Sequence, residues 1–274
     1  MSVSPDELAH WQTWVGRPEC RSETIAPTLL DRFAAAIGEQ RTGGAMPSLG
    51  HWAFFIQAVQ PDQLGPDGHP LRGGFLPPVT LERRMFASSD MRFHAPLAQD
   101  ELATHHAELV SLVHKKGSSG DLILAEVASR IEQAGELCIE ERNTIIYRAG
   151  GSATPAIAPK DLPPPDGAES WSPATADLFR FSAVTFNSHR IHYDLPYATG
   201  EEQYPGIVVH GPFTAAKLFG LARRSAGPLT RFSFRAQAPL FCGQPVLLYT
   251  GEDANTVIAR RCDGVTAMTA HFET

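Results

Sequence analysis

Apolar residues follow a helical period in some blocks of the chain and a strand-like alternation in others. TLLDRFAAAIGE (residues 28–39) places its apolar side chains on one helical face, and HWAFFIQAVQPDQL (51–64) predicts a second apolar helix. Residues 83–148 then hold long strand-like runs, interrupted by the turn signals KKGSSGD and QAGE. The N-terminal part is therefore predicted to form one or two helices followed by four strands.

The C-terminal part repeats this order of elements. ATADLFRFSAVTF (174–186) and GPFTAAKLFGLARRSAG (211–227) have the spacing of helices. Residues 229–273 follow as strand-like runs separated by turns that contain glycine.

Residues 149–170 separate the two parts and have no apolar period. They are rich in Pro, Gly, Ala and Ser, a composition typical of a linker. The predicted division is an N-terminal domain over residues 1–150, a linker over 151–170 and a C-terminal domain over 171–274.

Two short matches occur in the same order in the two parts. DRFAAAIG (31–38) corresponds to FRFSAVTF (179–186), and MRFHAPL (91–97) corresponds to RAQAPLF (235–241). Their shared order favours a duplicated unit of about 110 to 150 residues over chance. A bent antiparallel sheet wrapped round one long apolar helix would use the parts of each unit, so two copies would form an α+β pseudo-dimer in a single chain.

Composition and charge limit the class of partner. The 274 residues include 43% hydrophobic residues, enough for a substantial core, and carry a formal net charge of -7. This acidic balance argues against nucleic acid, and no apolar run reaches the roughly 20 residues of a membrane span. Cys20, Cys138, Cys242 and Cys262 lie far apart, which indicates reduced thiols in a cytoplasm and no thiolate zinc site.

Polar groups gather in FNSHRIHYD (186–194), although only 19% of the residues are charged. The segment YPGIVVHGPF (204–213) follows and opens the longest predicted helix. A polar turn placed just before a helix start is typical of a site at which reactive groups meet in an apolar pocket.

These segments resemble the MaoC-type hydratases and dehydratases of the hot-dog fold. FSAVTFNSHRIHYD followed by GEEQYPGIVVHGPF is most similar to the type 2 hydroxyacyl-thioester dehydratases and to bacterial double hot-dog hydratases acting on mesaconyl-C4-CoA (3-methylfumaryl-CoA) or itaconyl-CoA. The resemblance is strong over 178–220 and looser elsewhere. Residues 1–150 resemble the divergent half of such proteins, which carries no catalytic motif. The resemblance implies a double hot-dog fold, in which two antiparallel sheets are each wrapped round a long central helix.

One position departs from the motif of that family. The family has an aspartate five residues before its histidine, and counting back five from His192 gives Asn187. An asparagine cannot take a proton from water as a carboxylate can. Only the role of His192 therefore carries over directly from the resemblance.

Adding water to an enoyl thioester requires proton transfer, a held water and stabilisation of the enolate oxygen. His192 suits proton transfer, or else is a buried structural histidine. Asn187 could hold the water through its amide oxygen, or serve only as a turn residue. The amide of Gly211 at the helix start is expected to receive the thioester oxygen, unless the motif is merely a well-formed helix start, and His210 beside it is expected to line the pocket.

The remaining polar residues of the turn have less specific expectations. His189 lies three positions before His192, a spacing that a metal ion could use, but the sequence shows no third ligand nearby. No metal site is predicted, and His189 is expected to act as a hydrogen-bonding group. Asp194 either orients a histidine ring or is a solvated turn residue.

Cationic side chains are expected to bind the anionic parts of an acyl-CoA. If the acyl group is a branched dicarboxylic one, its free carboxylate would pair with Arg190, which is nearest in the sequence. Lys217 and Arg235 are among the basic residues expected to contact the phosphates of CoA, although a basic helix end often only complements the helix dipole. No cofactor is expected beyond the CoA of the substrate.

The preferred function is reversible hydration of an enoyl-CoA, with a C5 dicarboxylyl-CoA converted to citramalyl-CoA. One alternative is the same chemistry on fatty 3-hydroxyacyl thioesters carried by CoA or acyl carrier protein. Another is a non-catalytic module that binds acyl-CoA, and thioester hydrolysis is disfavoured because the motif matches hydratases. The oligomeric state is left open, with a homodimer as one option.

Overall fold

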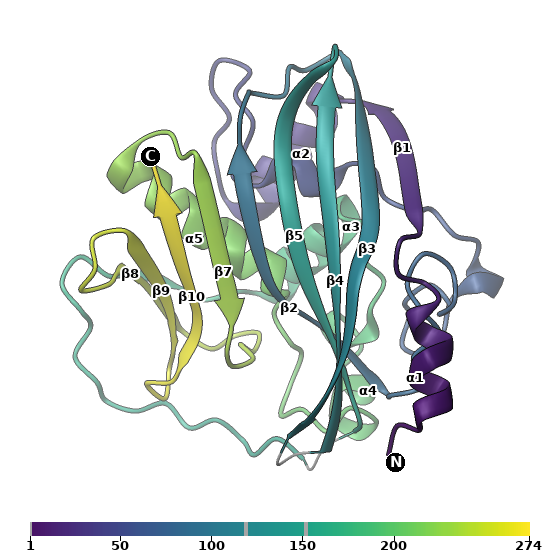
Figure 1. Ribbon diagram of the computed structural model, residues 1–274. Coiled ribbons are helices and arrows are strands. Elements are labelled where there is room, and N and C mark those ends of the chain that lie inside the picture. The colour runs from purple at the N-terminus through teal and green to yellow at the C-terminus, as the bar shows by residue number, and fades with distance from the viewer. Residues whose placement is uncertain (1, 118–119, 151–152) are drawn as a thin grey trace.

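The computed structural model describes residues 2–117, 120–150 and 153–274. Over these residues the strands form one antiparallel sheet of ten strands in the order β1-β3-β4-β5-β2-β7-β10-β9-β8-β6. Figure 1 shows the long strands β3, β4 and β5 in one half and the shorter β7 to β10 in the other. The strands are β1 (Pro18–Thr24), β2 (Arg83–Phe93), β3 (Leu102–Gly117), β4 (Gly120–Gln133), β5 (Glu136–Arg148), β6 (Glu169–Trp171), β7 (Arg231–Ala236), β8 (Val246–Thr250), β9 (Thr256–Arg261) and β10 (Thr266–Glu273).

Helices cover one side of this sheet. The helices are α1 (Pro5–Gln12), α2 (Pro27–Ile37), α3 (Thr175–Val184), α4 (Leu195–Gly200) and α5 (Gly211–Ala226), with short 3-10 turns η1 (Gly50–Ala53), η2 (Pro61–Gln63) and η3 (Arg190–His192). Helix α5 packs on β7, β8, β9 and β10 and buries most of its residues, as its predicted apolar face requires. The helices expected within 28–39, 174–186 and 211–227 are thus confirmed.

The duplication inferred from the sequence is confirmed at the centre of the sheet. Strands β2 and β7 pair antiparallel, and Asp90 lies opposite Ser233. The offset that carries the Ala-Pro-Leu at 95–97 onto the one at 238–240 also carries Asp90 onto Ser233, so a two-fold relation passes through this pair. The amides just before and within each Ala-Pro-Leu motif also donate to equivalent carbonyls, those of Cys138 and Ala267. The two halves are therefore related copies joined by strand pairing.

The matched helices α2 and α3 also pack against each other. Phe33 and Phe181, which occupy the same place in the matched segments, have ring centroids 5.8 Å apart. Phe181 in turn stacks on Phe213 of α5 at 4.9 Å, with an interplanar angle of 8°. All three rings are buried in the largest hydrophobic cluster, so aromatic packing holds the start of α5 against the rest of the core.

The helix predicted over residues 51–64 is wrong. The structure has only the η1 turn there, then irregular backbone up to η2, and the N-terminal half has no counterpart of α5 among its described residues. The backbone leaves the helical path at Phe55, whose φ is 62°. The amide of Phe55 donates instead to Glu23, a partner far from it in sequence. A tertiary contact thus overrides the helical period, and part of the sheet is left without a covering helix.

The predicted linker has little regular structure. Residues 153–168 form neither helix nor strand, whereas Glu169–Trp171 form β6 against β8. Residues 151 and 152 lie outside the described part of the chain. The division into domains at 150 and 171 stays a prediction, since both halves share one sheet. In the described ranges, no helix combines the length and apolar character needed to cross a membrane.

Candidate active site

The polar turn at residues 186–194 follows α3 and contains η3, so its side chains lie close to the start of α5. His192 is 8% exposed, and its Nδ1 lies 2.7 Å from the carbonyl oxygen of Val208. A carbonyl can only accept, so Nδ1 carries the proton and Nε2 of the neutral ring keeps a free lone pair. Burial lowers the pKa of His192 to about 4. The ring is therefore neutral near pH 7 and can accept a proton at Nε2.

His210 links this ring to helix α5. It is the N-cap residue of the helix, it is fully buried, and its ring stacks on His192 with centroids 3.7 Å apart. Its Nε2 lies 2.8 Å from Oγ of Ser182 on α3. Burial holds the pKa of His210 well below its usual range. The stack fixes His192 beside the first turn of α5, which is the juxtaposition that the motif predicts.

The helix start itself offers free donors. Gly211 is the first residue of α5 and Pro212 follows it, while the amide of Thr214 already donates to the carbonyl of His210. In the part of the chain that the structure describes, the Gly211 amide has no acceptor. A free amide at a helix N-terminus stabilises negative charge on an oxygen placed there.

A cavity of about 480 Å³ adjoins this helix start. Pro212 lines it from α5, Asn187 from the polar turn, and Phe55 and Phe86 are among its apolar walls. Much of it lies over the sheet face that the N-terminal half leaves without a helix, since side chains of β3, β4 and β5 form its base. The cavity is therefore a direct consequence of the missing helix at 51–64.

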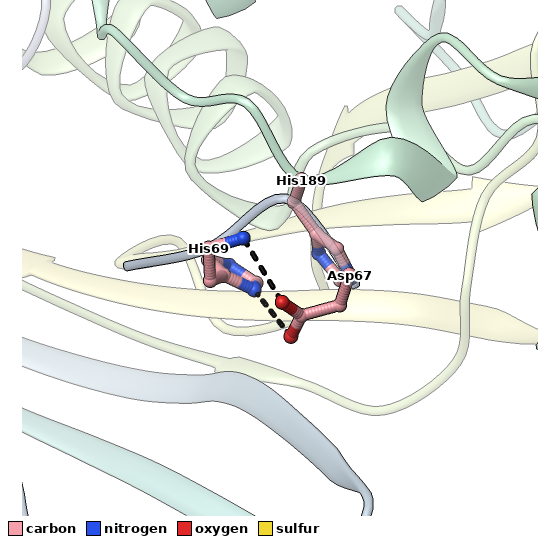
Figure 2. Close-up of side chains that lie close together, drawn as sticks. All are labelled: Asp67, His69 and His189. Carbon is pink, nitrogen blue, oxygen red and sulfur yellow. Dashed lines mark hydrogen bonds and ion pairs between the residues drawn. The ribbon is translucent and has the colours of Figure 1, made fainter. Parts of the chain in front are cut away.

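Two residues that the sequence analysis missed complete the site. Asp67 and His69, in the loop LGPDGHP (64–70) of the N-terminal half, lie beside His189, as Figure 2 shows. Oδ2 of Asp67 lies 3.0 Å from Nδ1 of His69, and Oδ1 accepts from the His69 amide, also at 3.0 Å. The only sequence signal was the pairing of an aspartate and a histidine in a turn bounded by glycine and proline.

Four imidazole rings form a continuous row through the site. Ring centroids are 4.0 Å apart between His69 and His189, 5.4 Å between His189 and His192, and 3.7 Å between His192 and His210. Burial, reinforced by the neighbouring rings, lowers the pKa of His189 to about 2, and burial also lowers the pKa of His69. Of the four, His69 lines the cavity directly. The expectation that His210 lines the pocket is wrong, because its fully buried ring is enclosed between contacts with His192 and Ser182.

Asp67 supplies a carboxylate to a site whose own motif lacks one. Burial alone would raise the pKa of Asp67, but its hydrogen bonds with the ring and the amide of His69 lower it well below its usual value. The group is therefore an ionised acceptor at neutral pH, and it fixes the tautomer of His69 with the proton on Nδ1.

Gly68 permits the close approach of the 64–70 loop to the polar turn. Its φ is 84°, and a Cβ atom built on it would lie 2.0 Å from the carbonyl oxygen of Ser188. The hydroxyl of Ser188 donates to the Gly68 carbonyl, and the amide of Arg190 donates to the Asp67 carbonyl at 2.9 Å. Backbone contacts, possible only with glycine here, thus bring Asp67 and His69 to His189.

Asn187 lies at the cavity, but its oxygen is already in use. Oδ1 accepts from the His189 amide at 3.0 Å, which is a local turn contact. Asn187 also lines a second, more apolar cavity of about 410 Å³. The Asn187 oxygen, which was expected to hold water, therefore accepts a backbone hydrogen bond within the turn. The NH2 group of Asn187 is the donor that its side chain offers.

Arg190 and Asp194 bind each other. Nε and Nη2 of Arg190 donate to Oδ2 of Asp194 at 2.9 and 2.8 Å, and Nη1 donates to the carbonyl of Pro66. Asp194 also caps α4 by accepting from the Tyr197 amide. Arg190 lines an outer groove of about 890 Å³ and is absent from the lining of the inner cavity. The structure thus places Asp194 against Arg190 and not against a histidine ring, and it uses Arg190 to anchor the 64–70 loop.

The two other predicted cations lie away from the cavity. Nζ of Lys217 donates to the carbonyl of Ile37 and lies 5.8 Å from the ring of Trp171. Arg235 is exposed on β7, whose alternate residues Phe232 and Phe234 point into the core. Because side chains alternate along a strand, Arg235 faces the outer side of the sheet.

Asp67, His69 and His189 could also hold a metal ion. One ligand atom from each lies within 4.8 Å of the others, and within residues 2–117, 120–150 and 153–274 no other such group of three occurs. A carboxylate with two neutral imidazoles is a suitable donor set for zinc. The sequence analysis missed this group because two of its members come from the other half of the chain.

Comparison with solved structures defines the class of fold. A crystal structure of HtdX from Mycobacterium tuberculosis superposes with a TM-score of 0.67 at 18% identity, over 94% of this chain and 99% of that one. A second Mycobacterium tuberculosis protein with a double hot-dog fold superposes with a TM-score of 0.54 at 13% identity, over 94% and 95% of the two chains. The protein therefore has the α+β double hot-dog fold.

The family follows from the sequence. Residues 48–242 match the model of the type 2 hydroxyacyl-thioester dehydratases, and the chain belongs to that family. It is 43% identical over 276 aligned positions to the mesaconyl-C(4)-CoA hydratase of Chloroflexus aurantiacus, covering 97% of this chain and 98% of that protein. The resemblance expected from the polar turn is confirmed.

We expect Gly68→Ala to destabilise the protein by about 1 to 3 kcal/mol, because a methyl group would collide with the Ser188 carbonyl at a backbone conformation that disfavours L-residues. Urea denaturation of the variant measures the loss. Gly74→Ala is the control, since a Cβ atom there meets nothing within 4 Å. Equal stability of the two variants would contradict the close contact.

The buried neutral histidines should make the fold sensitive to acid. His192 binds a proton at about pH 4 in the folded protein, against a usual value of 6.5, so the unfolded chain takes up the proton first as the pH falls. His192 alone should then lower the free energy of unfolding by roughly 3 kcal/mol between pH 6.5 and pH 4. The free energy of unfolding, measured by urea denaturation at several pH values across this range, should depend less on pH in the His192→Gln variant. Unchanged pH dependence in that variant, relative to the exposed control His94→Gln, would rule out this linkage.

Proposed function

We propose that the protein is a hydro-lyase that reversibly adds water to the double bond of an enoyl-CoA, converting mesaconyl-C4-CoA to citramalyl-CoA. One observation carries the proposal: the free Nε2 of the neutral His192 ring and the free amide of Gly211 are held together by the stack of His192 on His210. The similarity to the mesaconyl-C(4)-CoA hydratase supports the choice of substrate.

The reaction uses these groups in a simple order. Nε2 of His192 accepts a proton from water as the water oxygen attacks the carbon β to the thioester. The electron pair of the double bond moves toward the thioester oxygen, where the Gly211 amide and the positive end of α5 stabilise the developing negative charge. The proton held on His192 then passes to the α carbon, and the thioester re-forms. All atoms of water thus end on the product, and the reverse sequence is dehydration.

Asp67 and His69 take a supporting part in this proposal. His69 lines the cavity, and its Nδ1 is held by Asp67, so its Nε2 is free to bind the incoming water or the acyl group. The carboxylate that the family motif places near its histidine would thus be replaced by one from the other half of the chain. Asn187 is proposed to contact the water or the thioester through its NH2 group.

A fatty 3-hydroxyacyl thioester, carried by CoA or acyl carrier protein, is the second candidate substrate. The family description favours it, since the type 2 dehydratases are named for hydroxyacyl thioesters. A non-catalytic acyl-CoA binding module is the alternative of a different class. It has no need for a neutral histidine with a free lone pair beside a free helix amide, and the present site has both.

Compartment and assembly stay predictions. The four cysteines are free in the structure, which supports a reducing compartment such as the cytoplasm. The edge strands of the two halves, β2 and β7, are already paired with each other within the chain. A homodimer would therefore need another surface.

Hydration should be measured with mesaconyl-C4-CoA, itaconyl-CoA and crotonyl-CoA, following the enoyl absorbance together with free thiol. We expect loss of enoyl absorbance without thiol release, fastest for mesaconyl-C4-CoA. His192→Ala should lower kcat by about 10² to 10⁴-fold because the base is lost, while His94→Ala, at an exposed position, should retain activity. Thiol release would indicate hydrolysis, and a His192→Ala variant with most of its turnover would remove that residue from the mechanism.

Metal dependence separates the two uses of Asp67, His69 and His189. We expect full hydratase activity after dialysis against a chelator. The steps above need only proton transfer by His192, the Gly211 amide and the hydrogen-bonded pair of Asp67 and His69. Metal analysis of the purified protein should be made in parallel. A stoichiometric metal whose removal abolishes turnover, and whose return restores it, would show instead that these three residues are ligands.

A further inference from the structure

The inner cavity holds a group of buried polar side chains that the proposed mechanism does not use. His51, His105, Glu141 and Asn143 all line it, and we call these four residues the polar floor. They share the cavity with His69, Asn187 and Pro212 at the proposed reaction site. The rest of the lining is largely apolar, with Phe54, Phe55, Val127 and Ile131 among its members.

Strand register brings the polar floor together. Glu141 and Asn143 alternate along β5 and so point to the same face of the sheet. Glu141 lies opposite Ser129 of β4, and His105 of β3 lies opposite Ile131, the next inward residue of β4. His51 comes from η1, which lies over this face in place of a long helix. The cavity thus gathers polar residues from positions 51 to 143 of the sequence.

Three atoms of the polar floor have no hydrogen-bond partner among the described residues. They are Nε2 of His51, Nδ1 of His105 and Oδ1 of Asn143, and all three are buried. His51 is 3% exposed, and its Nε2 lies 3.6 Å from Oε2 of Glu141, beyond hydrogen-bond distance. Buried polar atoms without partners are costly and rare, so several in one cavity indicate that a bound molecule supplies their partners.

Glu141 is different, because its carboxylate is already satisfied. Oε1 accepts from the hydroxyl of Ser89 at 2.9 Å and from Nε1 of Trp52 at 3.1 Å. Burial alone would raise the pKa of Glu141, but its contacts with His51, Ser89 and Trp52 lower it. Burial lowers the pKa of His105. Nε2 of His51 and Nδ1 of His105 still serve as donors to a ligand, because either nitrogen of an imidazole carries the proton in one of the two tautomers of the ring.

We propose that the polar floor binds a carboxylate at the free end of the acyl group, which makes the site selective for dicarboxylic acyl thioesters. This rests on the proposed function and assigns a residue set to the acyl carboxylate. Nε2–H of His51 and Nδ1–H of His105 are the donors to this carboxylate, and the amide of Asn143, rotated so that its NH2 group faces the ligand, donates a further hydrogen bond. Arg190, the residue that the sequence suggested for this carboxylate, is bound to Asp194 outside the cavity.

An apolar acyl chain would leave the same atoms unpaired. Sites built to hydrogen-bond a ligand group reject analogues that lack the group far more strongly than apolar pockets reject small differences in size. A monocarboxylic acyl-CoA is therefore expected to bind and react less well, even though its chain fits the volume of the cavity.

Binding of unreactive thioesters tests the polar floor without relying on turnover. Succinyl-CoA and butyryl-CoA both carry four-carbon acyl groups, and only succinyl-CoA ends in a carboxylate. By calorimetry we expect the wild-type protein to bind succinyl-CoA at least about tenfold more tightly. His105→Phe, which keeps the stack on Phe55, and Asn143→Leu should each remove most of this preference by weakening succinyl-CoA alone.

His106→Phe is the matched control, since His106 is the next residue along β3 and faces the opposite side of the sheet. It should keep the wild-type preference. Equal affinity of the wild-type protein for the two thioesters would overturn the proposal, as would parallel weakening of both ligands in the His105→Phe and Asn143→Leu variants. All variants should be checked for wild-type thermal stability, and the milder His105→Gln replaces His105→Phe if that variant unfolds.

Kinetics with two enoyl substrates distinguishes failure of this inference from failure of the proposed function. In a hydratase, His105→Phe should lower kcat/KM for mesaconyl-C4-CoA at least about tenfold relative to crotonyl-CoA. If His105→Phe hydrates both substrates and the ratio of their kcat/KM values is unchanged, the proposed role of the polar floor is wrong and the proposed hydratase function stands. A preference for succinyl-CoA in a protein that hydrates neither substrate would overturn the proposed function and leave the polar floor intact.

Discussion

The contact between the 64–70 loop and the polar turn at 186–194 is the interaction on which the site depends. It joins the two halves of the chain through backbone groups, with Gly68 against Ser188 and the Asp67 carbonyl bound by the Arg190 amide. Because backbone contacts leave little freedom, Asp67 and His69 are held where they meet His189. The row of four imidazoles and the carboxylate at its end exist only because this contact forms.

The second constraint is the unequal covering of the two halves of the sheet. In the C-terminal half α5 fills the concave face and presents its N-terminus to the site. In the N-terminal half irregular backbone replaces the helix, and the uncovered face becomes a cavity with a polar floor. Duplication therefore yields one half that supplies the reactive helix start and another that supplies space for the acyl group.

Burial sets the chemistry of the residues between these halves. Removing imidazoles from water disfavours their charged form, so His189, His192 and His210 stay neutral at neutral pH. The carbonyl of Val208 then decides which nitrogen of His192 keeps the lone pair. A general base is thus obtained from the protein environment, with no carboxylate in the motif itself.

The sequence by itself determined the parts that depend on local pattern. Apolar period predicted α2, α3 and α5, and alternation predicted the strands except β1 and β6. The polar turn with its following helix start indicated His192 and Gly211, which lie near each other in the chain. Tertiary structure decided the rest: Asp67 and His69 reach the site by a loop contact, Arg190 binds Asp194, and His105 meets Asn143 through strand register. Local pattern fixes which face a side chain occupies, whereas the partners on that face come from distant strands and loops, and only the folded chain brings them within hydrogen-bond distance.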